Sequence, residues 1–208
     1  MQKYVLDTNV FFNMEAGLEL GKTTKEVMER LETAVKESKG ELVLYMPPRI
    51  VDELFTFFEN KEEPFVRSFL SAVVVQSPRP MELKFSATVF YDLVEEIRKR
   101  SYRGLNIGEE EIEQAAQTFM NKEALDKKSF QISVGEYIKK FRERYRNATR
   151  VGFLDSVADL DLIVLAYQLE APLISTDEGV IYWARKFGVQ EVPLSVWKKQ
   201  LDDLSHQN

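Results

Sequence analysis

The side chains of this sequence best suited to chemistry are carboxylates, and two of them follow short apolar stretches. Asp7 comes directly after the residues YVL, and Asp177 ends the stretch PLISTD. If both stretches are strands of one parallel sheet, their carboxyl ends meet at one edge, where ligand sites of such sheets gather. Each aspartate also precedes residues that suit a turn or a helix start, so capping a helix is an alternative role.

A third group of acids lies in the segment LDSVADLDLIVLAYQLE, which contains Asp155, Asp159 and Asp161. On a helix Asp155 and Asp159 would share a face, whereas Asp161 would point to nearly the opposite side. A capping box of Ser156 with Asp159 would explain one or two of these acids. Three acids without a basic residue in the segment repel one another unless a cation neutralises them. The segment therefore predicts a site for Mg²⁺, or for Mn²⁺ in its place, because both ions prefer oxygen ligands.

The cysteine and histidine content limits the kinds of catalysis that the chain could perform. The chain of 208 residues has no cysteine, and its one histidine, His206, lies close to the end. Thiolate chemistry, histidine-dependent hydrolysis and histidine-rich zinc sites are therefore excluded. No apolar stretch approaches the ~20 residues that span a bilayer, and the first residues do not resemble a targeting segment. We expect a cytoplasmic protein without membrane association, whose hydrolytic chemistry would depend on carboxylates.

Positive charge is concentrated in one part of the chain. The formal net charge of −6 argues against a nucleic-acid partner, but residues 127–150 carry eight Lys and Arg against two Glu. On a helix, basic side chains three and four residues apart form one ridge. The ridge consists of Lys139, Arg142 and Arg146, with Arg150 beside them. Its two possible roles are an RNA-binding surface that contacts phosphates and an ordinary solvated helix face.

Strand and helix patterns alternate at both ends of the chain but not in its middle. The predicted strands are 3–6, 41–46, 72–76, 172–175 and 189–192. The helices predicted between and after them are 24–38, 48–59, 62–71, 155–169, 179–187 and 195–204. This order predicts an α/β fold with a mostly parallel sheet flanked by helices.

The middle of the chain is predicted to be a helical insertion. After the breaker SPRP at 77–80, strand patterns are replaced by helices over 87–103, 108–121 and 133–149. We therefore expect one α/β domain formed by 1–80 and 151–208, interrupted by the insertion 81–150.

Two apolar patterns in this region allow different roles. One consists of Tyr137, Phe141 and Tyr145, whose four-residue spacing favours a buried seam over stacking on bases. The other is a helix side that would pack on the α/β domain or on another copy of the chain. It consists of Phe85, Phe90, Leu93, Val94 and Ile97.

Four fragments in this order, VLDTNVF, PPRIVDEL, DLDLIVLAYQL and ISTDEG, resemble those of a PIN-domain nuclease. A closer resemblance covers nearly the whole chain. The run from KKFRERYRNATR to WARKFGV, with SPRP and the helical insertion before it, is similar to the HARP family, homologues of the Aquifex protein-only ribonuclease P.

This resemblance implies an endoribonuclease that removes the 5′ leader of precursor tRNA with Mg²⁺ and assembles into a homo-oligomer through its helical insertion. It also implies that the insertion binds RNA through the basic ridge. The metal ligands that it implies are Asp7, Asp155, Asp159 and Asp177. Asp161 has an acidic counterpart in the family, but metal contact and an indirect or capping role are equally open to it. Glu53 is a further candidate, and solvated helix surface is the alternative for it.

Two other functions agree with the same residues. One is a toxin-type PIN ribonuclease that acts on other RNA, although such domains are usually shorter than this chain. The other is a non-catalytic oligomeric RNA-binding scaffold whose acids only cap helices.

Overall fold

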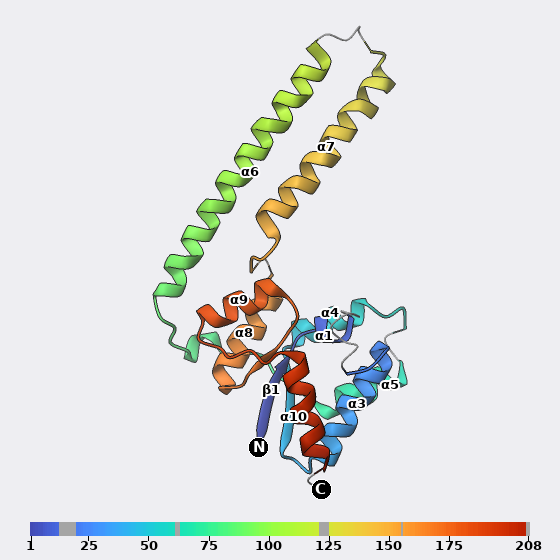
Figure 1. Ribbon diagram of the computed structural model, residues 1–208, viewed down its shortest axis with the longest axis vertical. Helices are drawn as coiled ribbons and strands as arrows, with labels where there is room; N and C mark the ends of the chain where they lie inside the picture. Colours follow the sequence, from blue (N-terminus) through green and yellow to red (C-terminus); the bar gives the residue numbers. More distant parts are fainter. Residues whose placement is uncertain (13–19, 61–62, 121–124, 155, 207–208) are drawn as a thin grey trace. The chain divides into compact units, whose positions relative to one another are not determined.

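The computed structural model describes residues 1–12, 20–60, 63–120, 125–154 and 156–206 (Figure 1). The chain forms two compact units. One consists of Met1–Phe85 with Leu154–Asn208, and the other of Ser86–Phe153. Asp155 is among the residues that lie outside the described part, so its predicted role as a metal ligand is carried forward from the sequence alone.

The first unit is built on a parallel sheet of four strands in the order β3-β2-β1-β4. The strands are β1 (Gln2–Leu6), β2 (Leu42–Met46), β3 (Val73–Val75) and β4 (Leu173–Ile174). Val5 of β1 pairs with Tyr45 on one side and with Leu173 on the other. Because the strands are parallel, their carboxyl ends share one edge. The predicted α/β fold with a parallel sheet flanked by helices is confirmed.

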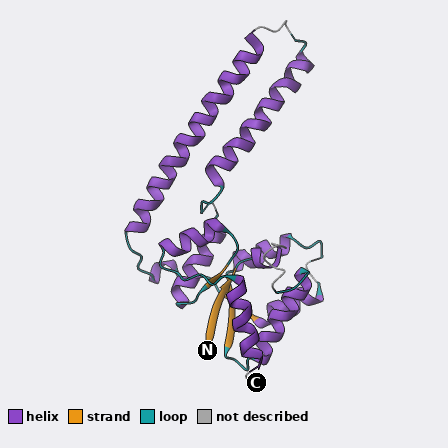
Figure 2. Cartoon of the chain, in the orientation of Figure 1, coloured by secondary structure: helices purple, strands orange, loops and turns teal. Residues whose placement is uncertain are grey.

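Helices surround this sheet (Figure 2). They are α1 (Asn9–Phe12), α3 (Thr24–Glu37), α4 (Pro48–Thr56), α5 (Pro64–Ala72), α8 (Val157–Leu169), α9 (Glu178–Lys186) and α10 (Leu194–His206). Both α4 and α5 begin with proline, whose missing N–H costs nothing in a first helical turn. A short 3-10 helix, Pro80–Glu82, follows β3.

The core lies between the sheet and these helices. Val5 and Leu6 of the central strand β1 are fully buried, as are Ile163 of α8 and Trp197 of α10. Complete burial of an apolar side chain of this size contributes about 1.5–3 kcal/mol to the free energy of folding. The carboxyl end of β1 is therefore held in a rigid setting, and this setting positions the residues that follow it.

The predicted strand at 189–192 is wrong, because the structure has only an isolated bridge there. Glu191 pairs with Leu173, and the Leu173 N–H donates to the Gln190 carbonyl. Pro193, which has no N–H for a ladder, follows at once, and α10 begins at the next residue. Pairing with β4 therefore ends at this single bridge.

The second unit is a pair of long helices, α6 (Thr88–Met120) and α7 (Lys127–Arg150). The sequence predicted two separate helices over 87–103 and 108–121, and this prediction is wrong. Gly104, the first residue after the predicted helix 87–103, lies inside α6 and is buried. A Cβ atom at this position would lie 2.6 Å from Cε2 of Tyr145 on α7. The glycine therefore allows close approach of the two helices without interrupting the helix.

The predicted apolar seam of α7 contacts α6, but it is only partly buried, since Tyr145 remains 44% exposed. The Tyr137 hydroxyl donates to Thr118 at 2.6 Å, and the Tyr137 ring lies 6.1 Å from that of Phe119. At the other end of the seam, Arg100 of α6 donates to the carbonyls of Thr149, Val151 and Gly152. These bonds satisfy carbonyl groups that the end of α7 leaves without helical partners.

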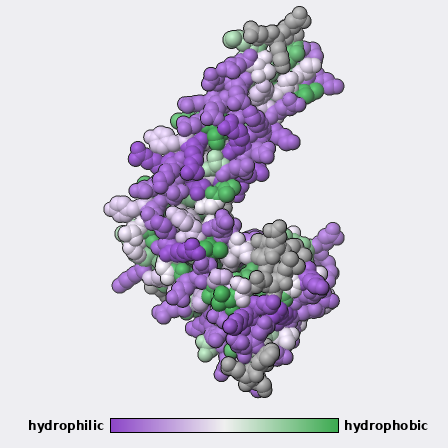
Figure 3. All heavy atoms as spheres, in the orientation of Figure 1, coloured by the Kyte–Doolittle hydropathy of each residue, from purple (hydrophilic) through white to green (hydrophobic). Residues whose placement is uncertain are grey.

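Side chains of α6 outside the seam remain exposed. Phe90, Tyr91, Val94 and Ile97 are between 51% and 75% exposed. The face of the molecule seen in Figure 3 is mostly hydrophilic along the two helices, with apolar residues interspersed. None of the helices in the described part of the chain combines the length and apolar composition that crossing a membrane requires.

Candidate functional site

The first predicted acid, Asp7, lies buried directly after β1. It is 2% exposed, and its N–H donates to the Ile174 carbonyl of the neighbouring strand β4 at 3.0 Å. Its Oδ2 atom accepts hydrogen bonds from the Ser175 hydroxyl at 2.5 Å and from the Asn9 amide at 3.1 Å. The side chain is thus fixed at the carboxyl edge of the sheet by residues from two chain segments.

Two other acids interact electrostatically with Asp7. Burial raises the pKa of Asp7, hydrogen bonds from Ser175 and Asn9 oppose this, and the charge of Asp177 raises it further. Burial also raises the pKa of Glu53 on α4, with a further contribution from Asp7. The Thr8 hydroxyl lies 3.1 Å from Oε1 of Glu53 and 3.4 Å from Oδ1 of Asp7. Asp7, Glu53 and Asp177 therefore form an acidic group at this edge of the sheet.

Asp177 caps helix α9 with one of its two carboxylate oxygens. Oδ1 accepts from the N–H groups of Gly179 at 2.6 Å and Val180 at 3.0 Å. Within the described residues, Oδ2 of this exposed carboxylate accepts no hydrogen bond. The capping role considered from the sequence is confirmed, and it leaves one oxygen of Asp177 available to a ligand.

The acids of the third group are in different situations. Ser156 is the N-cap of α8, and its hydroxyl accepts from the Asp159 N–H at 3.0 Å. This is the capping contact that the sequence predicts, and the Asp159 side chain is half-buried. Asp161 forms an ion pair with Arg49 of α4, with Nη1 and Oδ2 2.5 Å apart. Asp155, directly before Ser156, lies outside the described residues.

The chemical type of the oxygen atoms at this edge suits a divalent cation. In the described ranges, neither Asp7, Glu53 nor Asp177 forms an ion pair with a basic side chain, so their negative charge is uncompensated there. All the donors are carboxylate oxygens, which suit Mg²⁺ or Mn²⁺. No three acids within those ranges, which omit Asp155, are placed to hold one metal ion together.

Sequence reasoning did not identify the neutral partners of these acids. Thr8 and Asn9 directly follow Asp7, and Ser175 comes two residues before Asp177. Thr8 and Ser175 are 1% and 7% exposed. A signal was available, because buried hydroxyl groups need hydrogen-bond partners and the adjacent acids can supply them.

The second unit carries the predicted basic ridge on α7. Lys139, Arg142, Arg146 and Arg150 are all exposed. The first three of these form no ion pair with any described residue. These three side chains therefore present positive charge that no acid in the described part of the chain neutralises.

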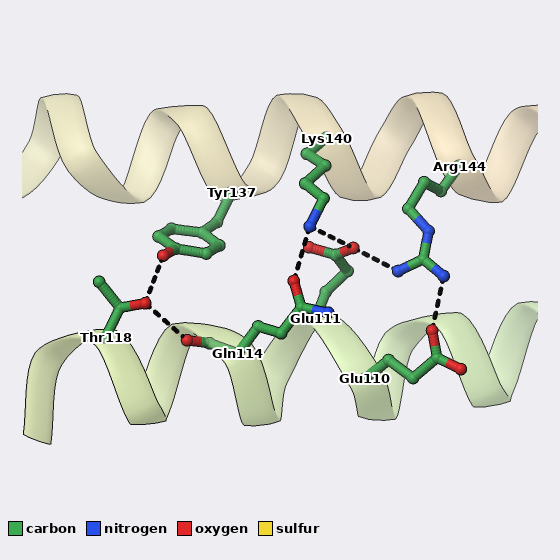
Figure 4. Close-up of polar contacts among 7 residues, drawn as sticks. All are labelled: Glu110, Glu111, Gln114, Thr118, Tyr137, Lys140 and Arg144. Atoms are coloured by element: carbon green, nitrogen blue, oxygen red, sulfur yellow. Dashed lines mark hydrogen bonds and ion pairs between the residues drawn. The ribbon is translucent and has the colours of Figure 1, made fainter.

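The neighbouring cations of α7 are instead bound by α6 (Figure 4). Glu111, which is 4% exposed, lies 3.3 Å from Nζ of Lys140 and 2.5 Å from Nη1 of Arg144. Arg144 also pairs with Glu110, and Lys140 donates to Gln114. Arg144 first and Lys140 second hold the pKa of Glu111 below its usual range.

The cations of α7 thus divide into two sets. Lys140 and Arg144 face α6 and are neutralised there, whereas Lys139, Arg142 and Arg146 project outward without acidic partners among the described residues. Of these five cations, the outward three have no acidic partner among the described residues and can contact an anionic partner.

A parallel sheet with acids at its carboxyl edge, together with the long basic helix α7, suggests a class of nuclease. Residues 3–205 match the family model described as PINc domain ribonuclease. This match includes both units of the chain.

Individual relatives define the family more narrowly. The chain is 34% identical to the RNA-free ribonuclease P of Thermococcus kodakarensis, over 97% of this chain and 95% of that protein. It is 32% identical to the protein of that name from Pyrococcus horikoshii, over 98% and 93% of the two chains. A bacterial relative with this name, from Thermodesulfovibrio yellowstonii, is 34% identical over 91% and 88%. The chain therefore belongs to the RNA-free ribonuclease P (HARP) family of PINc-domain ribonucleases and is an endoribonuclease.

Proposed function

We propose that this endoribonuclease removes the 5′ leader of precursor tRNA with the help of Mg²⁺, for which Mn²⁺ could substitute. The names of its relatives support the substrate. The observation that carries the chemistry is the buried carboxylate of Asp7, which lies uncompensated at the sheet edge within the electrostatic influence of Glu53 and Asp177. We place this reaction in the cytoplasm.

The residues that would hold the metal are Asp7, Asp155, Asp159 and Asp177. When bound, a divalent cation supplies a water of lowered pKa and positive charge for the leaving oxygen. The chain's own contribution is to fix the carboxylates. Ser175 and Asn9 orient Asp7, and the first turn of α9 orients Asp177. This preorganisation avoids rearrangement of the acids during the reaction.

The acidic edge repels RNA, so a separate surface has to attract it. We assign this role to Lys139, Arg142, Arg146 and Arg150 on α7. Duplex RNA is recognised mostly through its shape and its backbone, which suits cations on a long, regular helix. We also propose that the exposed apolar side chains of α6, including Phe90 and Val94, form contacts between copies of the chain in a homo-oligomer.

A cleavage assay tests the function directly. Purified protein is incubated with labelled precursor tRNA and Mg²⁺, and the new 5′ end is mapped. Cleavage at the mature 5′ end, lost in Asp7→Asn, is the expected result. Cleavage at unrelated positions would favour the toxin-type ribonuclease. RNA binding without any cleavage would favour the scaffold.

A metal titration gives an independent test. A cation that binds only the folded protein raises the melting temperature. We expect Mg²⁺ to raise it in the wild type and much less in Asp7→Asn or Asp159→Asn. The same rise in all three proteins would refute the assignment of these two ligands.

A further inference from the structure

One ion pair joins two elements that adjoin the acidic edge. Arg49 is the second residue of α4, which begins shortly after the carboxyl end of β2. Nη1 of Arg49 donates to Oδ2 of Asp161 on α8 at 2.5 Å. The Asp161 side chain is 14% exposed, whereas that of Arg49 is 59% exposed. The carboxylate is therefore largely covered, and much of the guanidinium faces solvent.

Arg49 and Glu53 lie on the same helix, α4. Arg49 and Glu53 are four residues apart, so they share one face of the helix. Glu53 accepts a hydrogen bond from Thr8, the residue that follows Asp7. Arg49 therefore lies one helical turn before an acid of the group, at the end of α4 that begins just after the carboxyl end of β2.

The donors of Arg49 are only partly used. Asp161 is the one hydrogen-bond partner of its guanidinium within the described ranges, and it engages Nη1. A guanidinium has five N–H donors in a fixed plane, a geometry that suits phosphate oxygens. With one edge held by a carboxylate, the remaining donors can contact an anion without loss of orientation.

We propose that Arg49 binds a backbone phosphate of the RNA at the margin of the acidic site, and that Asp161 is a positioning residue that acts through Arg49 and does not hold the metal. This inference rests on the proposed function, because it assumes that RNA enters the acidic edge. It assigns the two uncertain acids of this region different roles: Glu53 faces Asp7, whereas Asp161 orients a cation.

The negative charge of the acidic group explains why an oriented cation would help RNA to bind. Carboxylates that bind a metal repel a phosphodiester before the metal and the RNA are both in place. A cation at the margin reduces this repulsion. If the Arg49 guanidinium moved freely, RNA binding would have to fix it at a cost in conformational entropy. The ion pair with Asp161 orients the guanidinium before RNA binds and so reduces this cost.

A double-mutant cycle of Arg49→Gln and Asp161→Asn tests the inference. Precursor tRNA binding is measured without divalent ions over a range of salt concentrations. We expect Arg49→Gln to weaken binding about tenfold and to reduce the salt slope by about one phosphate contact. Asp161→Asn should weaken binding less, and the double variant should bind like Arg49→Gln alone. Arg49→Lys should restore the salt slope but only part of the affinity. Unchanged binding in Arg49→Gln, or additive losses in the double variant, would overturn the proposal.

The second readout is metal binding. The rise in melting temperature with Mg²⁺ should be the same in Arg49→Gln, Asp161→Asn and the wild type, and reduced in Asp7→Asn. If Asp161→Asn reduced it as strongly as Asp7→Asn does, Asp161 would be a metal ligand and the proposal would be wrong. The ion pair is open to solvent on the Arg49 side, where such pairs contribute little to stability, so both variants should fold.

Kinetics separate this inference from the proposed function. In single-turnover cleavage, Arg49→Gln should raise the half-saturating protein concentration and change the maximal rate little. Full activity of Asp7→Asn would contradict the proposed active site itself. Inactive Asp7→Asn together with unaltered Arg49→Gln would contradict only the role of Arg49.

Discussion

The Ser175 hydroxyl donates to Oδ2 of Asp7 at 2.5 Å, joining two residues that are 168 positions apart in the chain. The same hydroxyl oxygen accepts from the Asp177 N–H at 3.0 Å. Ser175 therefore connects the buried acid after β1 with the exposed acid at the start of α9. This small side chain is 7% exposed, so its geometry is fixed by the surrounding core.

The first prediction concerns Ser175→Ala. Hydrogen bonds that orient metal ligands typically affect activity or metal affinity 10–100-fold, and we expect a loss in this range. The hydrogen bond from Ser175 also lowers the pKa of Asp7. Its removal should therefore shift the acidic limb of the pH–rate profile to higher pH. Ser175→Thr, which keeps the hydroxyl, is the control. An unshifted profile in Ser175→Ala would show that the bond does not influence ionisation of Asp7.

The second prediction concerns the stability of the metal-free protein. Burial raises the pKa of Asp7 above its ordinary value of 3.8, so the folded state holds this proton more tightly than the unfolded state. Stability is then highest below the unfolded pKa and decreases as pH rises through the folded pKa. Asp7→Asn removes this cost. We therefore expect its melting temperature at neutral pH to exceed that of the wild type.

The pH dependence provides the control for this result. The advantage of Asp7→Asn should disappear in acid, where Asp7 is protonated in both the folded and the unfolded state. Melting curves from acidic to neutral pH in a chelator measure the difference. A constant advantage at all pH values would point to a cause other than ionisation of Asp7.

The sequence was sufficient to predict the meeting of Asp7 with Asp177. Parallel strands bring their carboxyl ends to one edge, and both acids follow such strands. The ion pair between Arg49 and Asp161 could not be predicted in this way. Its partners are 112 positions apart, and nothing in either local pattern specifies the other.

The wrong break in α6 has a similar cause. Glycine is a poor helix former, and Gly104 and Gly108 flank the predicted interruption between residues 103 and 108. Local preference was outweighed by tertiary contacts, because α7 places Tyr145 against Gly104 and Phe141 near Gly108. A single sequence does not reveal which face of a helix another helix will cover.

The third prediction compares the two sets of cations on α7. Arg142→Gln with Arg146→Gln removes two outward charges and should weaken precursor binding about 10–100-fold, with a salt slope lower by about two contacts. Lys140→Gln with Arg144→Gln removes the same charge from the side that pairs with Glu111. This control should bind RNA nearly as the wild type does but melt at a lower temperature. Equal losses of RNA affinity in both double variants would contradict the division.

The fourth prediction concerns Glu111 itself. Pairing with Arg144 and Lys140 lowers its pKa, so its contribution to stability is present above the unfolded pKa and is lost as pH falls through the folded pKa. Glu111→Gln should therefore increase amide hydrogen exchange in α6 and α7 at neutral pH, with a smaller difference from the wild type in acid. Glu143→Gln removes the same charge from an exposed position of α7 and should leave exchange unchanged.

The last prediction compares two glycines that both lie inside a helix but differ in the space around them. Gly135 lies inside α7, and a Cβ atom there would have no neighbour within 4 Å. Gly135→Ala should therefore stabilise the helix by about 1 kcal/mol, the ordinary difference between the two residues. Gly104→Ala gains the same preference but places Cβ 2.6 Å from Tyr145 and 3.3 Å from Thr149, so the helices must separate or Tyr145 must move.

We expect this steric cost to exceed the gain, so that Gly104→Ala lowers the melting temperature while Gly135→Ala raises it. Adding Tyr145→Ala removes the clashing ring, and Gly104→Ala should then be stabilising in that background. Thermal unfolding of the wild type, the three single variants and the double variant measures these effects. If Gly104→Ala stabilised the wild type as much as Gly135→Ala does, close contact between α6 and α7 at Gly104 would be disproved.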